Sequence, residues 1–339
     1  MGVNLRPLAM PREISLEDLG HKTIAIDAHN ILHQFLSIIR QRDGTPLKDA
    51  QGRVTSHITG LLHRTANLVE LGIKPVYVFD GTPHPLKMAT LTSRREIKEK
   101  ARDAWQQALA EGDLEEARKY AQQTSVLSPE RVQEAQNLLT ALGIPHVEAP
   151  GEGEAQASHM NRRGDVDCTG SQDFDCLLFG APVLVRNIAV TGKRKMPGRQ
   201  KWVQVSPERI SLEEVLSSHG IRREQLVDMA ILMGTDFNEG VKGIGPKTAL
   251  KLVQEHDSVE EMVEAGVAPA MEHLDEIRRI FLEPRVTDDY ELRWRPADEE
   301  AVLDFLSGEH QFSRDRVQGA LEKFRKFAEG RGQKELFDF

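Results

Sequence analysis

The stretch KTIAIDA, at residues 22–28, is a short apolar run that ends in an acid, and KPVYVFDG, at residues 74–81, repeats the arrangement. Continuous apolar runs of this length are typical of strands that are buried on both faces, as in a parallel sheet. Between them, SHITGLLHRTANLVELG has helical periodicity and is closed by Gly72. A strand, a helix and a second strand in this order form the unit from which parallel sheets are built. The sequence therefore predicts an α/β fold with a central, mostly parallel sheet flanked by helices.

The rest of the chain extends this pattern. From Ser93 to about Gln123 the chain is rich in charges and good helix formers, which is typical of a protruding helical segment. At residues 128–147, Ser128 and Pro129 predict the start of a helix that leads into a strand near Val147. The run APVLVRNIAV predicts another strand, and beyond residue 206 the pattern is mainly helical.

Composition limits the class of protein. The chain has 339 residues, 39% of them apolar and 29% charged, with a formal net charge of −9. The N-terminus lacks the apolar core of a signal peptide, and no apolar stretch has the length of a membrane span. Cys168 and Cys176 are the two cysteines, which suits a reducing compartment. These features predict an intracellular protein, and the acidic balance disfavours a nucleic-acid partner unless acid and base are segregated.

Acidic residues occur where strands are expected to end. In SQDFDCLLFG, at residues 171–180, two aspartates stand two positions apart, so in an extended chain both carboxylates would project to one face. Carboxyl ends of parallel strands meet at one edge of a sheet, so these acids can converge. The full set comprises Asp27, Asp80, Glu152, Glu154, Asp173, Asp175 and Asp236.

Converging carboxylates require cations, because like charges at close range raise carboxylate pKa values and destabilise the fold. Hard divalent ions such as Mg²⁺ prefer oxygen ligands, and two of them about 3.5 to 4 Å apart can activate water and stabilise the leaving oxygen in phosphodiester hydrolysis. Taken singly, each acid has another explanation: aspartates cap loops and helices, and glutamates in a first helical turn complement the helix dipole. Two pairs and three single acids at the same kind of position favour the metal site.

A second motif is GVKGIGPKTALKL, at residues 240–252. Gly243 and Gly245 flank an isoleucine at a helix start, which lets backbone N–H groups approach a phosphate, and Lys242 and Lys247 add positive charge. The alternative is a plain turn between two helices. A hairpin of this kind binds duplex backbone irrespective of base sequence.

The blocks AIDAHN, YVFDGTP, EAPGEGEAQAS, SQDFDCLLFGAP and MGTDFNEGVKGIGPKTAL, in this order and spacing, resemble the flap endonucleases, and most closely their archaeal branch. The resemblance covers the whole chain. It implies a PIN-like 5′-nuclease fold with a helical arch and a helix-hairpin-helix region. It also implies a structure-specific 5′ flap endonuclease and 5′-3′ exonuclease of DNA replication, including Okazaki fragment maturation, and DNA repair. Two Mg²⁺ ions per active site, replaceable by Mn²⁺, would be the cofactors.

Carried over by position, the resemblance assigns the seven carboxylates to the two metal ions. It assigns catalysis to Lys87 and Arg94, which stand seven residues apart at the root of the arch. Without the resemblance, the same basic run, KMATLTSRREIKEKAR, would be a solvated helix face. The implied DNA contacts are Gly2, His33, Arg40, Thr55, Lys242, Gly243, Gly245 and Lys247.

The chain departs from the family pattern in three places. His33 replaces a tyrosine that stacks on a flap base, which predicts weaker stacking by a smaller, titratable ring. Gly151 replaces a serine before the glutamate pair. The tail QKELFDF resembles a motif that binds the sliding clamp, through Gln333, Leu336 and Phe339, although one of its two aromatic positions is out of register.

The resemblance predicts a monomer with no membrane association, located in the cytoplasm or at the nucleoid, whose partners are branched DNA with a 5′ flap and the sliding clamp. Two alternatives stay open: a related nuclease that acts on bubbles or four-way junctions, and a junction-binding scaffold without catalysis. The expected regions are an N-terminal nuclease region (1–81), a helical arch (82–128), an internal nuclease region (129–236), a helix-hairpin-helix and C-terminal helical region (237–328) and a flexible tail (329–339).

Overall fold

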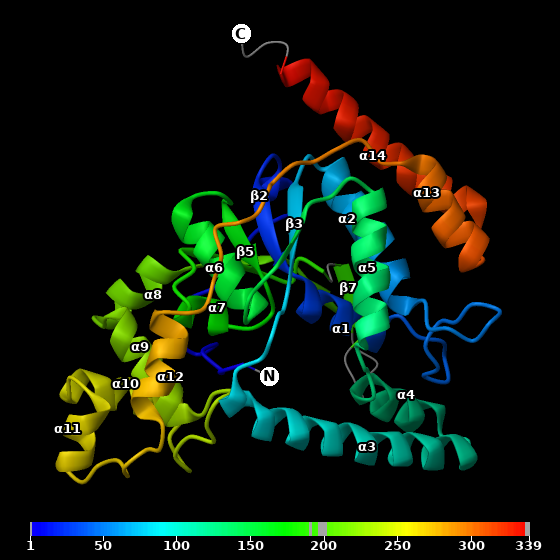
Figure 1. The fold of residues 1–339 in the computed structure, drawn as a ribbon. Coiled ribbons are helices and arrows are strands. Elements are labelled where there is room, and N and C mark those ends of the chain that lie inside the picture. The colour runs from blue at the N-terminus through cyan, green and yellow to red at the C-terminus, as the bar shows by residue number, and fades with distance from the viewer. Residues whose placement is uncertain (1, 190–191, 196–201, 336–339) are drawn as a thin grey trace.

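The structure is a computed structural model that describes residues 2–189, 192–195 and 202–335. At its centre lies a seven-stranded sheet with the order β1-β9-β6-β5-β2-β3-β4 (Figure 1). The strands are β1 (Arg12–Glu13), β2 (Thr23–Asp27), β3 (Lys74–Phe79), β4 (His146–Glu148), β5 (Cys168–Gly170), β6 (Val183–Arg186) and β9 (Glu208–Ser211). The neighbours from β6 to β4 pair in parallel, and β9 runs antiparallel to β6 and β1. The predicted α/β fold with a mostly parallel sheet is confirmed.

Helices cover both faces of the sheet, and successive residues of a strand point to opposite faces. Ile26 and Phe79 pack into one apolar cluster with a first group of helices, whereas Ala25 and Val78 pack into another with α6 (Gly153–Arg163). The first group consists of α1 (Ala28–Ile38), α2 (Ser56–Glu70), α5 (Pro129–Ala141) and α14 (Arg314–Glu335). Strands covered on both sides need apolar residues at every position, which explains the uninterrupted runs in the sequence.

The charged segment after β3 forms a pair of helices that leaves the body of the molecule. It contains η2 (Pro85–Lys87), a 3₁₀ turn, followed by α3 (Met88–Ala110) and α4 (Leu114–Gln123). In Figure 1, α3 runs along the lower edge and α4 folds back along it toward α1. Trp105 of α3 donates a hydrogen bond from Nε1 to the Asp43 carbonyl at 3.2 Å. This bond connects the arch, formed by η2, α3 and α4, to the loop between α1 and α2.

A second group of helices surrounds another apolar cluster that contains Phe179, Phe237 and Phe281. These helices are α7 (Asp175–Leu178), α8 (Leu212–His219), α9 (Arg223–Met233), α10 (Pro246–Glu255), α11 (Val259–Glu264) and α12 (Leu274–Leu282). From α12 the chain crosses back over the sheet to α13 (Glu299–Leu303) and the π-helical turn η3 (Asp304–Glu309) (Figure 1). Trp294 fixes this crossing by donating from Nε1 to the Pro75 carbonyl at 2.9 Å.

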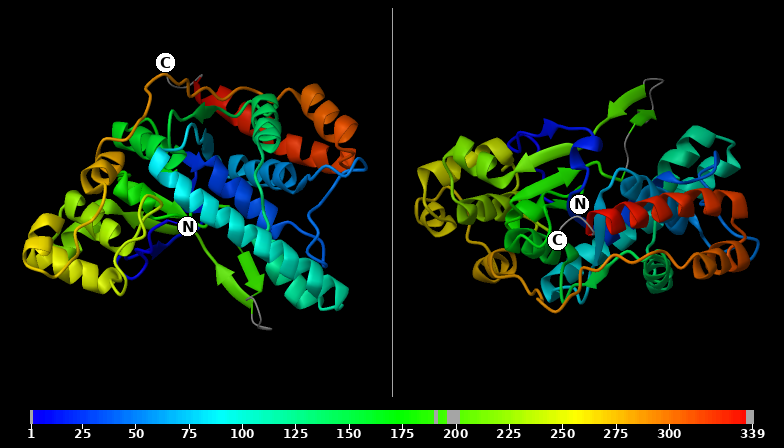
Figure 2. Two further views of the ribbon diagram at one scale, coloured as in Figure 1. Left: turned by 60° about the horizontal axis from the view of Figure 1, so that its bottom comes forward. Right: turned by 90° about the horizontal axis from the view of Figure 1, so that it is seen from above.

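A two-stranded hairpin, β7 (Gly192–Lys195) and β8 (Trp202–Val205), projects from the body in both views of Figure 2. The sequence did not predict it. Among the described residues, no helix combines the length and the apolar character needed to cross a membrane.

Three local predictions are wrong. Asp173 and Asp175 do not lie on an extended strand, because the chain turns at Phe174 into the short helix α7. Asp236 follows the helix α9 and not a strand. Residues 329–335, expected as part of a flexible tail, belong to α14, since EGRGQKE has no proline and its charged and amide residues favour helix despite two glycines.

Candidate active site

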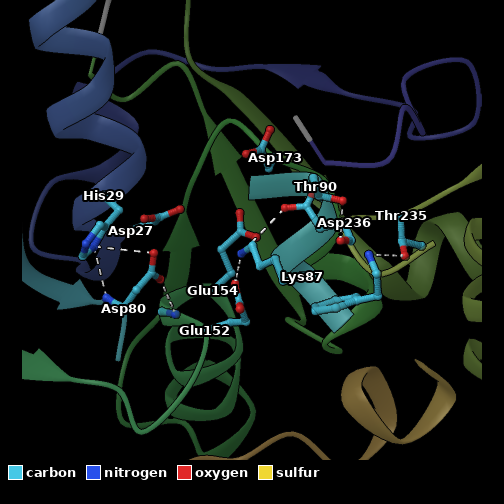
Figure 3. Close-up of polar contacts among 12 residues, drawn as sticks. Asp27, His29, Asp80, Lys87, Thr90, Glu152, Glu154, Asp173, Thr235 and Asp236 are labelled. Carbon is cyan, nitrogen blue, oxygen red and sulfur yellow. Dashed lines mark hydrogen bonds and ion pairs between the residues drawn. The ribbon is translucent and has the colours of Figure 1, made fainter. Parts of the chain in front are cut away.

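Two of the acids stand at the carboxyl ends of neighbouring parallel strands (Figure 3). Asp27 ends β2 and also caps α1, where its Oδ1 accepts a hydrogen bond from the backbone N–H of Asn30 at 2.9 Å. Asp80 follows β3 directly and accepts from the backbone N–H of Gly153 at 2.6 Å. A Cβ at Gly153 would lie 2.8 Å from that Asp80 oxygen, so only glycine allows this contact.

The other five acids reach the same place from helix starts and turns. Glu152 is the N-cap residue of α6 and Glu154 lies in its first turn. Asp175 opens α7, and its Oδ1 accepts from the backbone N–H of Val3 at 2.8 Å. Asp173 lies in the turn before α7, and Asp236 lies in the turn after α9. The seven acids therefore lie close enough to influence one another or the same lysine, and helix N-termini contribute at least as many of them as strand ends do.

The cluster is electrostatically strained. Burial, followed by the neighbouring Asp80 carboxylate, raises the pKa of Asp27 well above its usual value. Burial, followed by Asp173, likewise raises the pKa of Glu154 well above its usual value and that of Asp175 to about 7. These carboxylates attract a cation that enters the site, because its positive charge relieves their mutual repulsion and lowers their raised pKa values.

Lys87 and Arg94 supply two cations from the root of the arch. Lys87 pairs with Glu152, and its Nζ lies 3.6 Å from Asp236 Oδ2, while Arg94 pairs with the other oxygen of Asp236. Burial acts to lower the pKa of the Lys87 ammonium, but Glu152 and the other carboxylates outweigh it and raise that pKa. Thr90, between the two cations on α3, donates from Oγ1 to the Asp236 carbonyl at 2.9 Å (Figure 3). Three residues at the root of the arch, Lys87, Thr90 and Arg94, therefore contact Glu152 or Asp236.

The donor set fits divalent metal ions. All seven side chains offer carboxylate oxygens, which are the ligands that Mg²⁺ prefers, and those of Asp27, Asp175 and Asp236 are buried. As the described part of the chain stands, no three His, Cys, Asp or Glu side chains form a ready cage. Instead, Glu152 and Asp236 are paired with protein cations.

Three neighbours of the acids were not predicted as site residues. Ser171 Oγ lies 2.9 Å from Glu154 Oε1 and 3.3 Å from Asp27 Oδ2, so its single proton can serve one carboxylate at a time. Asn30 donates from Nδ2 to Asp173 at 3.1 Å, and His29 Nδ1 accepts from the backbone N–H of Asp80 at 3.1 Å. Proximity in the sequence could have identified these three residues, because each lies within three positions of a site acid.

The predicted hairpin is an open turn between α9 and α10. Gly243 has a φ of +91°, and Gly245 is the N-cap residue of α10. A Cβ at either glycine would meet nothing within 4 Å, so neither is required by internal packing. Lys242 and Lys247 are exposed beside them. Phosphate binding by this turn stays a prediction that the exposed backbone favours.

The remaining predicted DNA contacts lie in varied settings. Gly2 lies against Asp175, where a Cβ would come within 2.5 Å of Oδ1. Burial, followed by nearby Lys98, lowers the pKa of His33 to about 4, so its ring is neutral at neutral pH. Arg40 donates to the carbonyls of Leu36 and Gly44 at 2.8 and 2.9 Å, and Thr55 is buried at the start of α2. Their roles toward DNA stay predictions. The predicted clamp-binding side chains lie outside the described part of the structure; they belong to Gln333, Leu336 and Phe339.

Comparison with known proteins gives the same family from sequence and from structure. The family models for the XPG N-terminal domain and the XPG I-region match residues 1–101 and 143–236. Flap endonuclease 1 of Methanosarcina barkeri is 52% identical over 98% of each chain, and that of Pyrococcus abyssi is 52% identical over 96% of this chain and 94% of the relative.

Solved structures agree. Flap endonuclease-1 from Methanococcus jannaschii superposes with a TM-score of 0.78 at 43% identity and covers 97% of this chain. The catalytic core of Rad2 in complex with DNA has the same fold, with a TM-score of 0.71 at 23% identity. The family resemblance and the 5′-nuclease fold predicted from the sequence motifs are confirmed. This chain belongs to the flap endonuclease family of XPG-type nucleases.

Proposed function

We propose that this protein is a structure-specific 5′ flap endonuclease, with 5′-3′ exonuclease activity, that hydrolyses a phosphodiester bond near the base of a 5′ flap in DNA replication and repair. One observation carries the proposal. The seven acids converge at the carboxyl end of the sheet, and two cations from the arch pair with two of them, Glu152 and Asp236. A scaffold that only bound junctions would have no use for strained carboxylates, since they repel DNA.

We infer that the carboxylates hold two Mg²⁺ ions, with Mn²⁺ able to substitute. Asp27, Asp80, Glu152 and Glu154 are the candidate ligands of one ion, and Asp173, Asp175 and Asp236 of the other. Metal ions at such a site supply an activated water and stabilise the leaving oxygen. The protein orients this set: Gly153 N–H holds Asp80, Val3 N–H holds Asp175, and Ser171 serves Asp27 or Glu154.

Lys87 and Arg94 are the proposed catalytic cations. Their side chains already face the site, where they neutralise Glu152 and Asp236. With metal ions bound, Glu152 and Asp236 would no longer need Lys87 and Arg94 to balance their charge, and both side chains would be free to approach the scissile phosphate. A cation placed where negative charge develops stabilises the transition state more than the ground state.

Binding and location complete the proposal. The turn at Lys242–Lys247 would grip the duplex phosphates, His33 would contact the flap as a neutral ring, and the C-terminal tail would bind the sliding clamp. We propose that the protein acts as a monomer inside the cell, where its DNA substrate lies.

The test is cleavage of matched flap, nick, bubble and four-way-junction substrates in Mg²⁺, with Asp80→Ala and Asp175→Ala as active-site variants. We expect the flap to be cut fastest, and each variant to lose cleavage while keeping measurable junction binding. Preferential cutting of bubbles or four-way junctions would identify a related nuclease instead. Binding of all four substrates without cleavage of any would identify a scaffold.

A further inference from the structure

His84 holds the 3₁₀ turn that carries Lys87. It is the N-cap residue of η2, and its Nδ1 accepts a hydrogen bond from the backbone N–H of Leu86 at 3.3 Å. Its carbonyl accepts from the backbone N–H of Lys87 at 2.9 Å. The bond to the ring satisfies a backbone donor that a helix start otherwise leaves without a partner, and the bond to the carbonyl is the backbone bond of the 3₁₀ turn itself. The position and direction of the Lys87 backbone therefore depend on His84.

The His84 ring also contacts the segment that carries Asp236. It packs edge-on against Phe237, with ring centroids 6.1 Å apart and an interplanar angle of 89°. Phe237 in turn packs against Phe281 of α12 at 5.5 Å. One imidazole therefore links the root of the arch with the turn after α9 and, through it, with α12.

The second ring nitrogen faces α12 directly. His84 Nε2 lies 3.7 Å from Glu276 Oε1. Because Nδ1 accepts a hydrogen bond, the proton of the neutral ring belongs on Nε2, which points it toward this carboxylate. His84 and Glu276 line a cavity of about 310 Å³ that extends to Glu152, the partner of Lys87.

We propose that His84 is a positioning residue for Lys87. This inference rests on the proposed catalytic role of Lys87. His84 fixes the first turn of the arch so that the Lys87 ammonium stays over the carboxylates, and its contacts with Phe237 and Glu276 set that turn against the helices next to the DNA-binding hairpin. His84 touches no reacting atom. Its contribution passes through Lys87.

The experiment is a double-mutant cycle in single-turnover cleavage at saturating enzyme and Mg²⁺, with flap binding measured in Ca²⁺. We expect His84→Ala to slow cleavage about 10-fold, with a change in flap affinity of less than about 3-fold. His84→Asn should recover most of the rate, because an asparagine side chain caps a helix start as well. In a Lys87→Ala background, His84→Ala should slow cleavage further by less than about 2-fold, since the group that it positions is gone.

A cap elsewhere gives the matched control. Asp298 caps α13 by accepting from the backbone N–H of Ala301 at 3.1 Å, and Asp298→Ala should leave the rate unchanged. An equal 10-fold loss from His84→Ala with and without Lys87 would overturn the proposal. So would a loss of flap affinity that matches the loss of rate. If Lys87→Ala alone has no effect on the rate, the role of Lys87 in the proposed function fails first, and the cycle reveals this separately.

Discussion

Replacing Lys87 with methionine should remove a charge and keep most of the side-chain volume, which isolates the electrostatic contribution to cleavage. The Lys87 side chain is 14% exposed and that of Arg94 35%, so the lysine charge is screened less by water. Two unit charges 4 Å apart interact by about 4 kcal/mol at an effective dielectric constant of 20 and by about 1 kcal/mol in bulk water. At about 1.4 kcal/mol per factor of ten, we expect Lys87→Met to slow the chemical step by about 10² to 10³. Arg94→Met should cost about 10².

The assay is single-turnover cleavage of a flap substrate at saturating enzyme and Mg²⁺, beside equilibrium binding in Ca²⁺. The large effect should appear in the rate and only a small one in affinity, because the interaction strengthens in the transition state. Arg95→Met is the matched control. Arg95 adjoins Arg94 on α3, but its side chain is 83% exposed and pairs with Glu99, so its loss should leave the saturated rate unchanged. If Lys87→Met and Arg94→Met cut at nearly the wild-type rate once saturated and lose only affinity, both residues merely attract DNA.

Three further outcomes follow from the geometry. Substituting Lys242 and Lys247 by alanine should weaken duplex binding for any sequence and flatten its dependence on log salt, and an unchanged slope would remove the hairpin from the interface. Gly2→Ala should impair cleavage and raise the Mg²⁺ concentration required, since the new Cβ would come within 2.5 Å of Asp175 Oδ1, and unchanged Mg²⁺ titrations would contradict this. Metal-free protein should melt at a lower temperature at pH 8 than at pH 5. Folding raises the pKa of Glu154 and raises that of Asp175 to about 7, so the fold loses stability as the pH rises from about 4 through 7. Mg²⁺ should restore the melting temperature at pH 8, and melting that ignores both pH and Mg²⁺ would count against the metal site.

The sequence was sufficient for the part of the site that follows from strand order. Asp27 and Asp80 end two apolar runs, and two parallel strands joined by a helix bring their carboxyl ends together whatever the details of packing. The pair Asp173 and Asp175 was found by spacing, but its local geometry was wrong. The turn at Phe174 into α7 depends on burial of that short helix in the apolar cluster that contains Phe179, Phe237 and Phe281, which no local pattern encodes.

Residues that act through long-range contacts escaped prediction. Ser171 reaches Asp27 and Glu154 across 144 and 17 residues of sequence, and His84 reaches Glu276 on α12. Such contacts exist only after the sheet and both helical groups have assembled. The hairpin of β7 and β8 was missed for another reason, since a lone two-stranded element with little apolar patterning gives a weak signal.

Asp236 links the carboxylate cluster with the proposed DNA-binding hairpin along the chain. It follows α9, and Gly243 of the hairpin lies seven residues further on. The turn between them is anchored by Phe237, whose side chain is buried and packs against Phe281 of α12. A duplex seated on the hairpin is therefore placed relative to the carboxylates by a short, packed segment. Because backbone contacts carry no base sequence, the position of the cut should follow the junction and not the sequence around it.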